Sequence, residues 1–507
     1  MNLATGRGHE PKSSSTGVGA CARMFLFLAI AVIVAITVVR VWIWWRNGAG
    51  ISFASGVMIT MAADLRDGVF YRPLLDSAGY GGTRYFPLYF CLLALLLKLG
   101  TPILASAYLL SAAAIVLLMW GTFQLLRELG AEAWLATCAA LMLLAASSVQ
   151  LSLTTPQADG LAAALNVWGL AAIVPAPRRR RRILLASLLF TLAWSAKLTT
   201  VFGVAAAVVW LIATGYKRVA WTLAAETLCG YLIVASAMIV ASRGRVVDIF
   251  RACASGGTDW RFIAGTPARI KAITIHGDSG LIWFVIIAAV LIWAMRSWKL
   301  LQNLPALLLI ATSAVTLMIF ASPGTAGNHL LDVYVATVIL LVAWVATSTS
   351  PVEKQLGVGG LALLTLIAAL PLARNLRNWT RTYHPHQFQQ IIAAIGPTKK
   401  PILSENPIIP VLAGQHPYVI DPWMVQLLGK RSSGFARPLL EGLRNQSFSV
   451  VVLFIGDPAQ KGGQWWYDNM SFGPGFTPAL LDNYKLALII DDDRIYLPKP
   501  AAERGAK

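Results

Sequence analysis

The sequence predicts an α-helical protein that crosses a membrane about eleven times and ends in a small α/β domain outside the membrane. Of its 507 residues, 57% are hydrophobic and only 13% are charged, and the mean hydropathy is +0.64. The apolar residues fall in long runs that the surface of a soluble protein does not carry. After residue 373 the composition changes to short apolar stretches between polar turns. Composition and patterning together exclude an ordinary soluble globule.

Charge and cysteine content narrow the class further. Lysine and arginine number 42 and aspartate and glutamate 23, so the net charge is +19. The basic residues cluster at the ends of apolar runs, which favours a role in membrane orientation over a nucleic-acid partner. The five cysteines are scattered and have no Cys-x-x-Cys spacing. We therefore expect no disulfide framework and no structural zinc site.

The first predicted span follows a basic tail at residues 1–23. Residues 24–45 are apolar and long enough as a helix to cross a hydrocarbon core of about 30 Å. We interpret this segment as a retained helix with a cytoplasmic N-terminus, and a cleaved signal peptide is the alternative. The further apolar runs lie at 103–125, 133–151, 158–176, 183–198, 199–215, 219–241, 280–295, 304–321, 329–348 and 358–373.

The run at 86–99 decides the orientation of every later loop. Its apolar part is only about 18 Å long as a helix, which is too short to span a bilayer. If this run does not cross, the basic residues that follow all lie on the cytoplasmic side, as the positive-inside bias expects. These residues are Arg127, the block 178–182, Lys217, Arg218, Arg296, Lys299 and Lys354. We therefore interpret 86–99 as a juxtamembrane helix at the outer face.

This map divides the chain into three predicted regions. Residues 1–23 form a cytoplasmic tail, 24–373 a transmembrane domain with outer loops at 46–102 and 242–279, and 374–507 an extracytoplasmic α/β domain. The strands expected in the last region lie at 401–404, 418–420, 449–454 and 486–490, and its helices at 388–395 and 438–444. Alternation of this kind is typical of a βα fold. No GxGxxG or Walker sequence is present, so no nucleotide is expected.

Asp159 is the most informative polar residue of the predicted bundle. Pro156 breaks the chain where one helix arrives at the outer surface, and Asp159 begins the helix that returns into the membrane. A carboxylate at this place can act as a base or as a metal ligand facing an outer cavity. Because aspartate is also a common helix cap, a plain capping role is the alternative.

The first outer loop places carboxylates between arginines and aromatic residues. It contains Asp64, Asp67, Arg84 and Tyr85, and residues 57–65 have the pattern of a short amphipathic helix at the interface. Guanidinium groups pair with phosphate and carboxylates accept hydrogen bonds from sugar hydroxyls. The loop therefore suits a phosphorylated, polyol-bearing substrate. An interfacial loop anchored by its aromatic side chains is the alternative.

Two further polar positions lie at the predicted outer rim. Lys197 stands between two apolar runs, where a lysine needs a partner such as a lipid phosphate or snorkels to the headgroups. Asn328 and Asp332 lie one helical turn apart at the start of the tenth run, so they share a face and can point into one cavity. A network of helix caps is the alternative for this pair.

Taken together, these features resemble the GT-C superfamily of integral membrane glycosyltransferases, in the branch of aminoarabinose transferases, protein O-mannosyltransferases and Rgt-type core transferases. The order of short elements carries the resemblance, which covers most of residues 24–430. These elements are Gly68-Val69-Phe70-Tyr71, Tyr85-Phe86-Pro87-Leu88-Tyr89, Pro156-x-x-Asp159, Lys197-x-Thr199, the turn before Asn328, Ser404-Glu405-Asn406-Pro407 and Asp421-Pro422.

The resemblance implies a multi-pass enzyme of a bacterial inner membrane. It would transfer a sugar, with inversion, from a polyprenyl-phosphate donor to a lipid, glycan or protein acceptor on the extracytoplasmic face. Its other partners would be membrane lipids. Two alternatives from other classes stay open: a transporter or flippase of lipid-linked sugars, and a catalytically inactive membrane scaffold.

The resemblance also implies roles for individual residues. Asp159 would bind a divalent metal or position substrate, and Lys197 would hold the donor phosphate, a role that we assign to Arg84 as well. Family members carry an acidic residue soon after the first helix, whereas residues 51–56 here have no carboxylate. We therefore predict Asp64 as the general base, with Asp67 as a second candidate. Tyr85, Asn328 and Asp332 complete the predicted substrate site.

Overall fold

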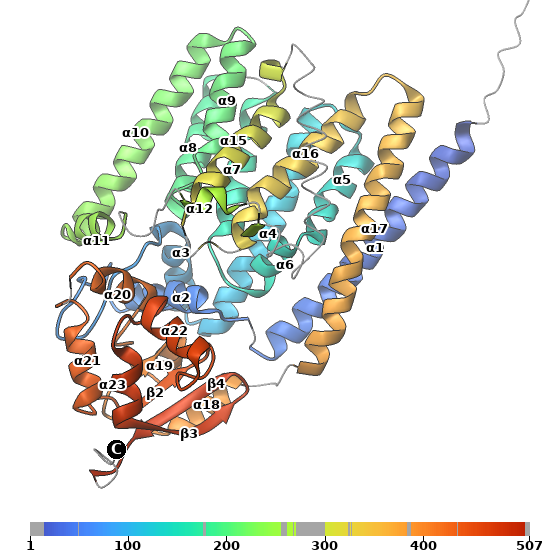
Figure 1. Cartoon of the computed structure of the whole chain (residues 1–507). Helices are drawn as coiled ribbons and strands as arrows, with labels where there is room; N and C mark the ends of the chain where they lie inside the picture. The colour runs from blue at the N-terminus through green and yellow to red at the C-terminus, as the bar shows by residue number, and fades with distance from the viewer. Residues whose placement is uncertain are drawn as a thin grey trace, which may run out of the picture.

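A computed structural model describes most of the chain. The described residues are 15–48, 50–175, 179–254, 261–266, 268–269, 300–322, 325, 327–382, 387–432 and 434–501. Several expectations lie outside these residues: most of the basic tail, the apolar run at 280–295, and much of the outer loop 242–279 beyond residue 254. The rest of the chain forms a helical bundle and a smaller domain with a β-sheet (Figure 1).

A helix occupies each of the ten predicted apolar runs that the structure describes. The bundle helices are α1 (Ser15–Arg46), α4 (Ile103–Glu128), α5 (Ala133–Met142), η1 (Leu143–Ala145), α6 (Ser147–Thr154), α7 (Asp159–Ile173), α8 (Arg180–Ala196), α9 (Phe202–Ala213), α10 (Lys217–Ala241), α15 (Leu304–Ile319), α16 (Leu331–Thr347) and α17 (Pro351–Thr382). Shorter elements around them are α2 (Phe53–Arg66), α3 (Pro87–Lys98), α11 (Arg245–Ala254), α12 (Arg261–Ala264), η2 (Leu300–Gln302) and η3 (Gly327–Leu330).

Five helices in the described part of the chain are long and apolar enough to cross a membrane, or six if one bent pair counts as a single span. The bent pair is the run expected at 133–151, which turns by 73° between Ala145 and Ser147. That run is therefore a broken helix and not one straight span. Four further apolar helices are shorter, namely α3, α7, α9 and α15. The total of about eleven crossings stays a prediction.

Helix α7 lies at the centre of the bundle. Fourteen of its residues are buried, and it packs against α4 and α8. Its neighbours approach closely: a Cβ on Gly169 would lie 2.6 Å from the ring of Phe190 in α8. By contrast, α10 turns large apolar side chains outward, including Trp221, Ile233 and Val240. An outer surface of this kind is stable in lipid and unstable in water.

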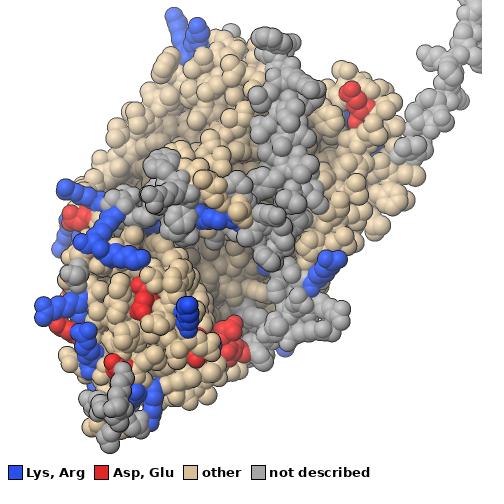
Figure 2. Space-filling view, in the orientation of Figure 1, with Lys and Arg blue, Asp and Glu red and all other residues tan. Residues whose placement is uncertain are grey.

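Charged side chains avoid most of the bundle surface in view. They collect on the C-terminal domain and at its boundary with the bundle, and a few lie at the far end of the bundle (Figure 2). That far end carries the connection from α16 to α17, where Lys354 pairs with Glu132 at 2.8 Å. Lys217 and Arg180 begin helices at the same end. The bundle therefore has two polar ends and an apolar belt between them.

The C-terminal domain contains a four-stranded mixed sheet with the strand order β1-β2-β4-β3. Strands β1 and β2 are parallel, and β4 runs antiparallel to both β2 and β3. Three of the strands lie where the sequence predicts them, whereas β4 was not predicted and 418–420 forms only a single bridge. The elements are α18 (Gln387–Ile395), β1 (Ile402–Ser404), α19 (Ile408–Leu412), α20 (Pro422–Gly429), α21 (Arg437–Arg444), β2 (Val450–Leu453), α22 (Lys461–Asn469), α23 (Phe476–Asn483), β3 (Tyr484–Ile490) and β4 (Asp493–Pro498).

The two faces of this sheet bury different neighbours, because successive side chains of a strand point to opposite sides. Leu403, Val451 and Tyr496 pack against the domain's own helices α21, α22 and α23. Ile402, Val452 and their neighbours face α18, α19 and, from the first outer loop, α2. Residues 55–64 of α2 are accordingly all buried. An amphipathic helix at the interface would expose one face, and this part of α2 does not, because α3 packs on one side of it and α19 of the C-terminal domain on another.

The loop after α2 also docks on the C-terminal domain. Tyr80 forms a parallel bridge with Val419, donating to the Tyr418 carbonyl at 2.7 Å and accepting from the Ile420 amide at 3.0 Å. Gly79 permits this approach. It has a φ of +123°, and a Cβ at this position would lie 1.9 Å from the Tyr418 carbonyl oxygen.

Replacing Gly79 by alanine is expected to lower the free energy of unfolding by about 2 kcal/mol or more, because the new Cβ overlaps the Tyr418 carbonyl in a backbone conformation that disfavours side chains. Thermal unfolding of the protein in detergent measures this loss. Gly359→Ala is the control, because Gly359 lies in α17 and a Cβ added there would meet nothing within 4 Å. Equal melting temperatures for the two variants would contradict the docking.

Candidate active site

Three helix ends meet at the end of the bundle that faces the C-terminal domain. Asp159 begins α7, Lys197 follows the last residue of α8, and Asn328 lies in η3 before α16. The Lys197 ammonium lies 2.6 Å from Oδ1 of Asp159, and the Asn328 amide donates to Oδ2 of Asp159 at 3.2 Å. Asp159 is 6% exposed. The structure therefore joins three of the predicted site residues through one buried carboxylate.

Asp332 extends this cluster from the first turn of α16. Its Oδ2 lies 4.0 Å from the Lys197 ammonium, and the residue is 8% exposed. Lys197 thus lies between two buried carboxylates. It points inward to these partners, and its side chain is only 13% exposed, so it does not snorkel to the surface. A lone charge at this depth would be costly, whereas a paired one is tolerated.

Local sequence explains how these groups meet. Helix α6 ends at Thr154, Pro156 follows in the corner, and α7 starts three residues later. This corner reverses the direction of the chain and places Asp159 at the N-terminus of α7. At the end of α8 the backbone of Lys197 is extended, with φ of −152° and ψ of 117°, so its side chain leaves the helical path. A simple helix cap accepts hydrogen bonds from the backbone of its own helix. Both carboxylate oxygens of Asp159 accept from side chains of other elements instead.

Metal binding at Asp159 stays a prediction. Both of its carboxylate oxygens accept hydrogen bonds, from Lys197 and from Asn328, and the Lys197 ammonium already balances its charge. Among the described residues no group of three His, Cys, Asp or Glu side chains has an arrangement that could hold a metal. The groups present also suit hydrogen bonding to a ligand. An ammonium has three donors, and Asp159 uses one of them.

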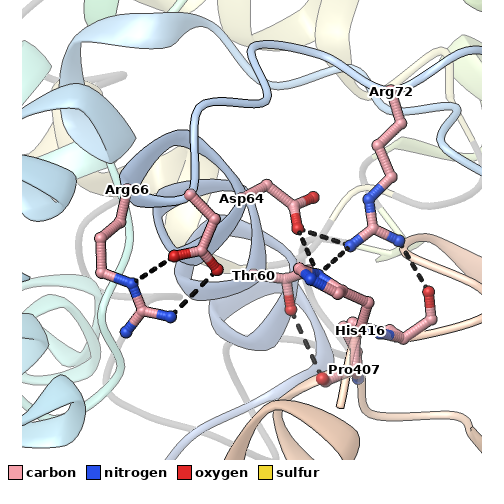
Figure 3. A network of polar contacts seen from close by, with 8 residues as sticks. Thr60, Asp64, Arg66, Arg72, Pro407 and His416 are labelled. Atoms are coloured by element: carbon pink, nitrogen blue, oxygen red, sulfur yellow. Dashed lines mark hydrogen bonds and ion pairs between the residues drawn. The ribbon is translucent and has the colours of Figure 1, made fainter. Parts of the chain in front are cut away.

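Asp64 lies in a different network, shown in Figure 3. Its Oδ1 accepts from Arg72 at 2.5 Å and lies 3.3 Å from Nδ1 of His416 in the C-terminal domain. Arg72 also donates to the Pro417 carbonyl at 2.8 Å. Asp64 and Arg72 are 3% and 8% exposed. We call this set the latch, because it joins the first outer loop to the C-terminal domain.

Asp67 belongs to neither cluster. It forms an exposed ion pair with Arg66 at 2.8 Å, and the hydrogen bond from Arg66 lowers the pKa of Asp67. Both hydrogen bonds to its carboxylate come from Arg66, and neither links it to Asp159 or Asp64 in the described part of the chain. Its catalytic role stays a prediction, because no predicted site residue that the structure describes bonds to its carboxylate.

We call Asp159, Lys197, Asn328 and Asp332 the bundle cluster. Arg84 and Tyr85 lie between this cluster and the C-terminal domain. The Arg84 guanidinium lies 6.0 Å from the centre of the Trp423 ring at the start of α20. The Tyr85 carbonyl accepts a hydrogen bond from Tyr71 at 2.8 Å, which holds the segment in place. Burial raises the pKa of the Tyr85 phenol, and the negative charges of Asp421 and Asp159 raise it further. The charges of Asp421 and Asp159 therefore both reach the Tyr85 phenol.

Two buried polar groups were either not predicted from the sequence or left open by it. Arg40, inside the first apolar run, lies 3.5 Å from Oε1 of Gln150 in α6 and is 7% exposed. A single cation within an apolar run was the available signal. Glu405, in the Ser404-Glu405-Asn406-Pro407 element, accepts hydrogen bonds from Trp466 at 2.6 Å and from the Phe454 amide at 3.0 Å. Both contacts are structural, and the pKa of Glu405 is raised by its burial.

Replacing Arg72 by methionine is expected to destabilise the protein by about 3–5 kcal/mol, because Asp64 is left buried without its cation. The double variant Asp64→Leu/Arg72→Met should recover part of the loss, since it removes both charges. Arg66→Met is the matched control, with an expected cost below about 1 kcal/mol for an exposed pair. Melting temperature and proteolysis of the 46–102 loop measure the effect. Equal losses for Arg72→Met and Arg66→Met would show that the latch carries no stability.

Comparisons with known proteins find solved structures that share the fold of this chain. No protein-family model matches the sequence, and no curated protein sequence matches it. Two crystal structures of ArnT from Cupriavidus metallidurans are similar to this chain. The structure bound to undecaprenyl phosphate aligns with a TM-score of 0.56 at 13% identity, covering 94% of this chain and 99% of the other. The apo structure aligns with a TM-score of 0.52 at 12% identity over the same shares. The chain therefore has the fold of these two ArnT structures, which agrees with the resemblance to aminoarabinose transferases drawn from the sequence.

Proposed function

We propose that this protein transfers a sugar from a polyprenyl-phosphate donor to a membrane-associated acceptor. The acceptor would be a lipid, a glycan or a protein. The observation that carries the proposal is the buried cluster of Lys197, Asp159 and Asp332 at the polar end of an apolar bundle. The likeness in fold to ArnT, one structure of which contains undecaprenyl phosphate, supports a lipid phosphate as the ligand class.

The chemistry of sugar transfer matches the groups that this cluster offers. The acceptor hydroxyl attacks the anomeric carbon and loses its proton to a carboxylate, while the bond from that carbon to the phosphate oxygen breaks. The bonding electrons leave with the polyprenyl phosphate, which gains negative charge. Lys197 can donate to that phosphate through an N–H that Asp159 does not use, and Arg84 supplies a second cation. Burial strengthens these interactions, because little water screens them.

We further propose that this end of the bundle faces the extracytoplasmic side of a bacterial inner membrane. Lys217, Arg180 and Lys354 lie at the opposite end, where the positive-inside bias expects the cytoplasm. The C-terminal domain and the N-terminus would then lie on opposite sides of the membrane. Tyr85, Asn328 and Asp332 would bind substrate, and transfer would proceed with inversion at the anomeric carbon.

Asp159→Asn and Lys197→Met are each expected to lower the transfer rate at least about 100-fold, because each removes a charge that the reaction needs. The measurement is the loss of labelled sugar from undecaprenyl-phosphate-linked donors in membranes that contain the full chain. Lys354→Met is the control, because its pair with Glu132 lies at the far end of the bundle. Normal transfer by both site variants would defeat the proposal.

A second comparison separates the two roles open to Asp64. If Asp64 is the general base, Asp64→Asn should lose at least about 100-fold in transfer rate. Arg72→Met keeps the carboxylate but breaks the latch, so it should retain more activity than Asp64→Asn at a temperature where both are folded. Equal activities of the two variants would assign Asp64 to the latch alone.

A further inference from the structure

Asp421 is a buried carboxylate without a side-chain partner. It precedes α20, is 1% exposed, and neither of its oxygens has a well-formed hydrogen bond among the described residues. The backbone amides of Trp423 and Met424 lie close enough to lower its pKa, but its side chain accepts no capping hydrogen bond from α20. The other buried carboxylates that the structure describes each have a hydrogen bond or ion pair with a side chain. They are Asp64, Asp159, Asp332, Glu405 and Asp493.

One more buried unpaired group and one exposed cation lie near Asp421. The indole N–H of Trp423 has no acceptor among the described residues, although Trp423 is only 8% exposed. The Arg84 guanidinium lies over the Trp423 ring and forms no ion pair that the structure describes. Burial raises the pKa of Asp421 to about 6, and the positive charge of Arg84 partly offsets that effect. A carboxylate and an indole donor are thus buried without side-chain partners, and an exposed guanidinium lies over the indole ring.

Such an arrangement is unfavourable for folding alone. A buried polar atom without a partner destabilises the native state, and native proteins keep few of them. They persist where a ligand supplies the missing partners. Asp421 offers two acceptors, while Trp423 and Arg84 offer donors, so the missing ligand carries both donors and acceptors. Sugar hydroxyls are both at once. A phosphate is a poorer match, because near neutral pH most of it has lost its last proton and the buried carboxylate repels its negative charge.

The position of this group ties it to the bundle cluster. Arg84 and Tyr85 are adjacent in sequence, and the charges of Asp421 and Asp159 both act on the Tyr85 phenol. The Arg84–Tyr85 segment therefore stands between the phosphate-facing cluster and the start of α20. A sugar attached to a phosphate at Lys197, or an acceptor sugar approaching it, would lie on the side of Asp421.

We propose that Asp421, Trp423 and Arg84 form a sugar-binding subsite that the C-terminal domain contributes to the active site. This inference rests on the proposed function, because it places a sugar next to the lipid phosphate. Asp421 accepts hydrogen bonds from two hydroxyls of that sugar, and the Trp423 indole and Arg84 donate to its oxygens. The sugar is either the one on the donor or the one on the acceptor.

The test measures equilibrium binding to the purified full chain in detergent at pH 8, where the Asp421 carboxylate is ionised. The probes are undecaprenyl phosphate, the same carrier bearing glucose, mannose or arabinose, and the free saccharides and oligosaccharides. Asp421→Asn is compared with the wild type and with Asp492→Asn, an exposed aspartate in the turn between β3 and β4. We expect Asp421→Asn to lose sugar affinity by about tenfold or more, because hydrogen bonds to a charged acceptor are lost. Binding of bare undecaprenyl phosphate should not change.

The two probe classes identify the source of the sugar. Loss of the extra affinity that a sugar gives to the carrier assigns the subsite to the donor. Loss of free saccharide binding, with the carrier series unchanged, assigns it to the acceptor. If Asp421→Asn matches the wild type with every probe, or if the wild type gains no affinity from any sugar, the subsite is disproved. Failure of the wild type to bind bare undecaprenyl phosphate would count against the proposed function itself, and the saccharide series would still decide the role of Asp421.

The melting temperature distinguishes a binding role of Asp421 from a structural one, because the two roles predict changes of opposite sign. Removing an unpaired buried charge should raise the Tm of Asp421→Asn by roughly 2 °C or more relative to the wild type. Asp492→Asn should leave Tm within about 1 °C. A lower Tm together with weaker binding would mean that Asp421 holds the domain together, and the proposal would then be wrong.

Discussion

The packing of α2 against α19 of the C-terminal domain is the contact on which the arrangement of the outer face depends. Ile402 and Val452 of the sheet belong to the same hydrophobic cluster as α2, which comes from the first outer loop, hundreds of residues earlier in the chain. Loop and domain therefore share one hydrophobic core. Because that core holds α2, it also sets the path of the chain from Arg72 to Tyr85. Arg84 is thereby placed between the bundle and α20.

Several carboxylates at this face are buried, and they differ in the side chains that pair with them. Asp64 is neutralised by Arg72, which suits a permanent contact between loop and domain. Asp159 shares Lys197 with Asp332, so the cluster holds a cation and an excess of acceptors. Asp421 has no such side-chain partner within the described residues. Burying a carboxylate is unfavourable at all three sites. A cation offsets this cost at Asp64 and Asp159, and we propose that a ligand does so at Asp421.

Several features of the fold could be predicted from local sequence. Long apolar runs become helices, because only a hydrogen-bonded helix satisfies its own backbone in lipid. Pro156 marks the corner before α7, and the strands at 402–404 and 450–453 follow short β-branched and aliphatic runs. The bend between Ala145 and Ser147 was missed, because the run stays apolar through the break. Strand β4 was missed because its pattern, Asp493 to Pro498, mixes charged and apolar residues and is completed only by pairing with β2 and β3.

Composition and patterning were enough to predict a multi-pass membrane protein, and the resemblance of its short motifs to the GT-C superfamily implied the arrangement of its parts. They were also enough to identify Asp159, Lys197, Asn328 and Asp332 as residues of interest. The partners of the charges became known only from the folded chain: Lys197 for Asp159, Arg72 for Asp64, and no side chain for Asp421 among the described residues. The physical reason is that pairing depends on distances between residues far apart in sequence. Those distances are set by how helices and a sheet pack together, and no local pattern records them.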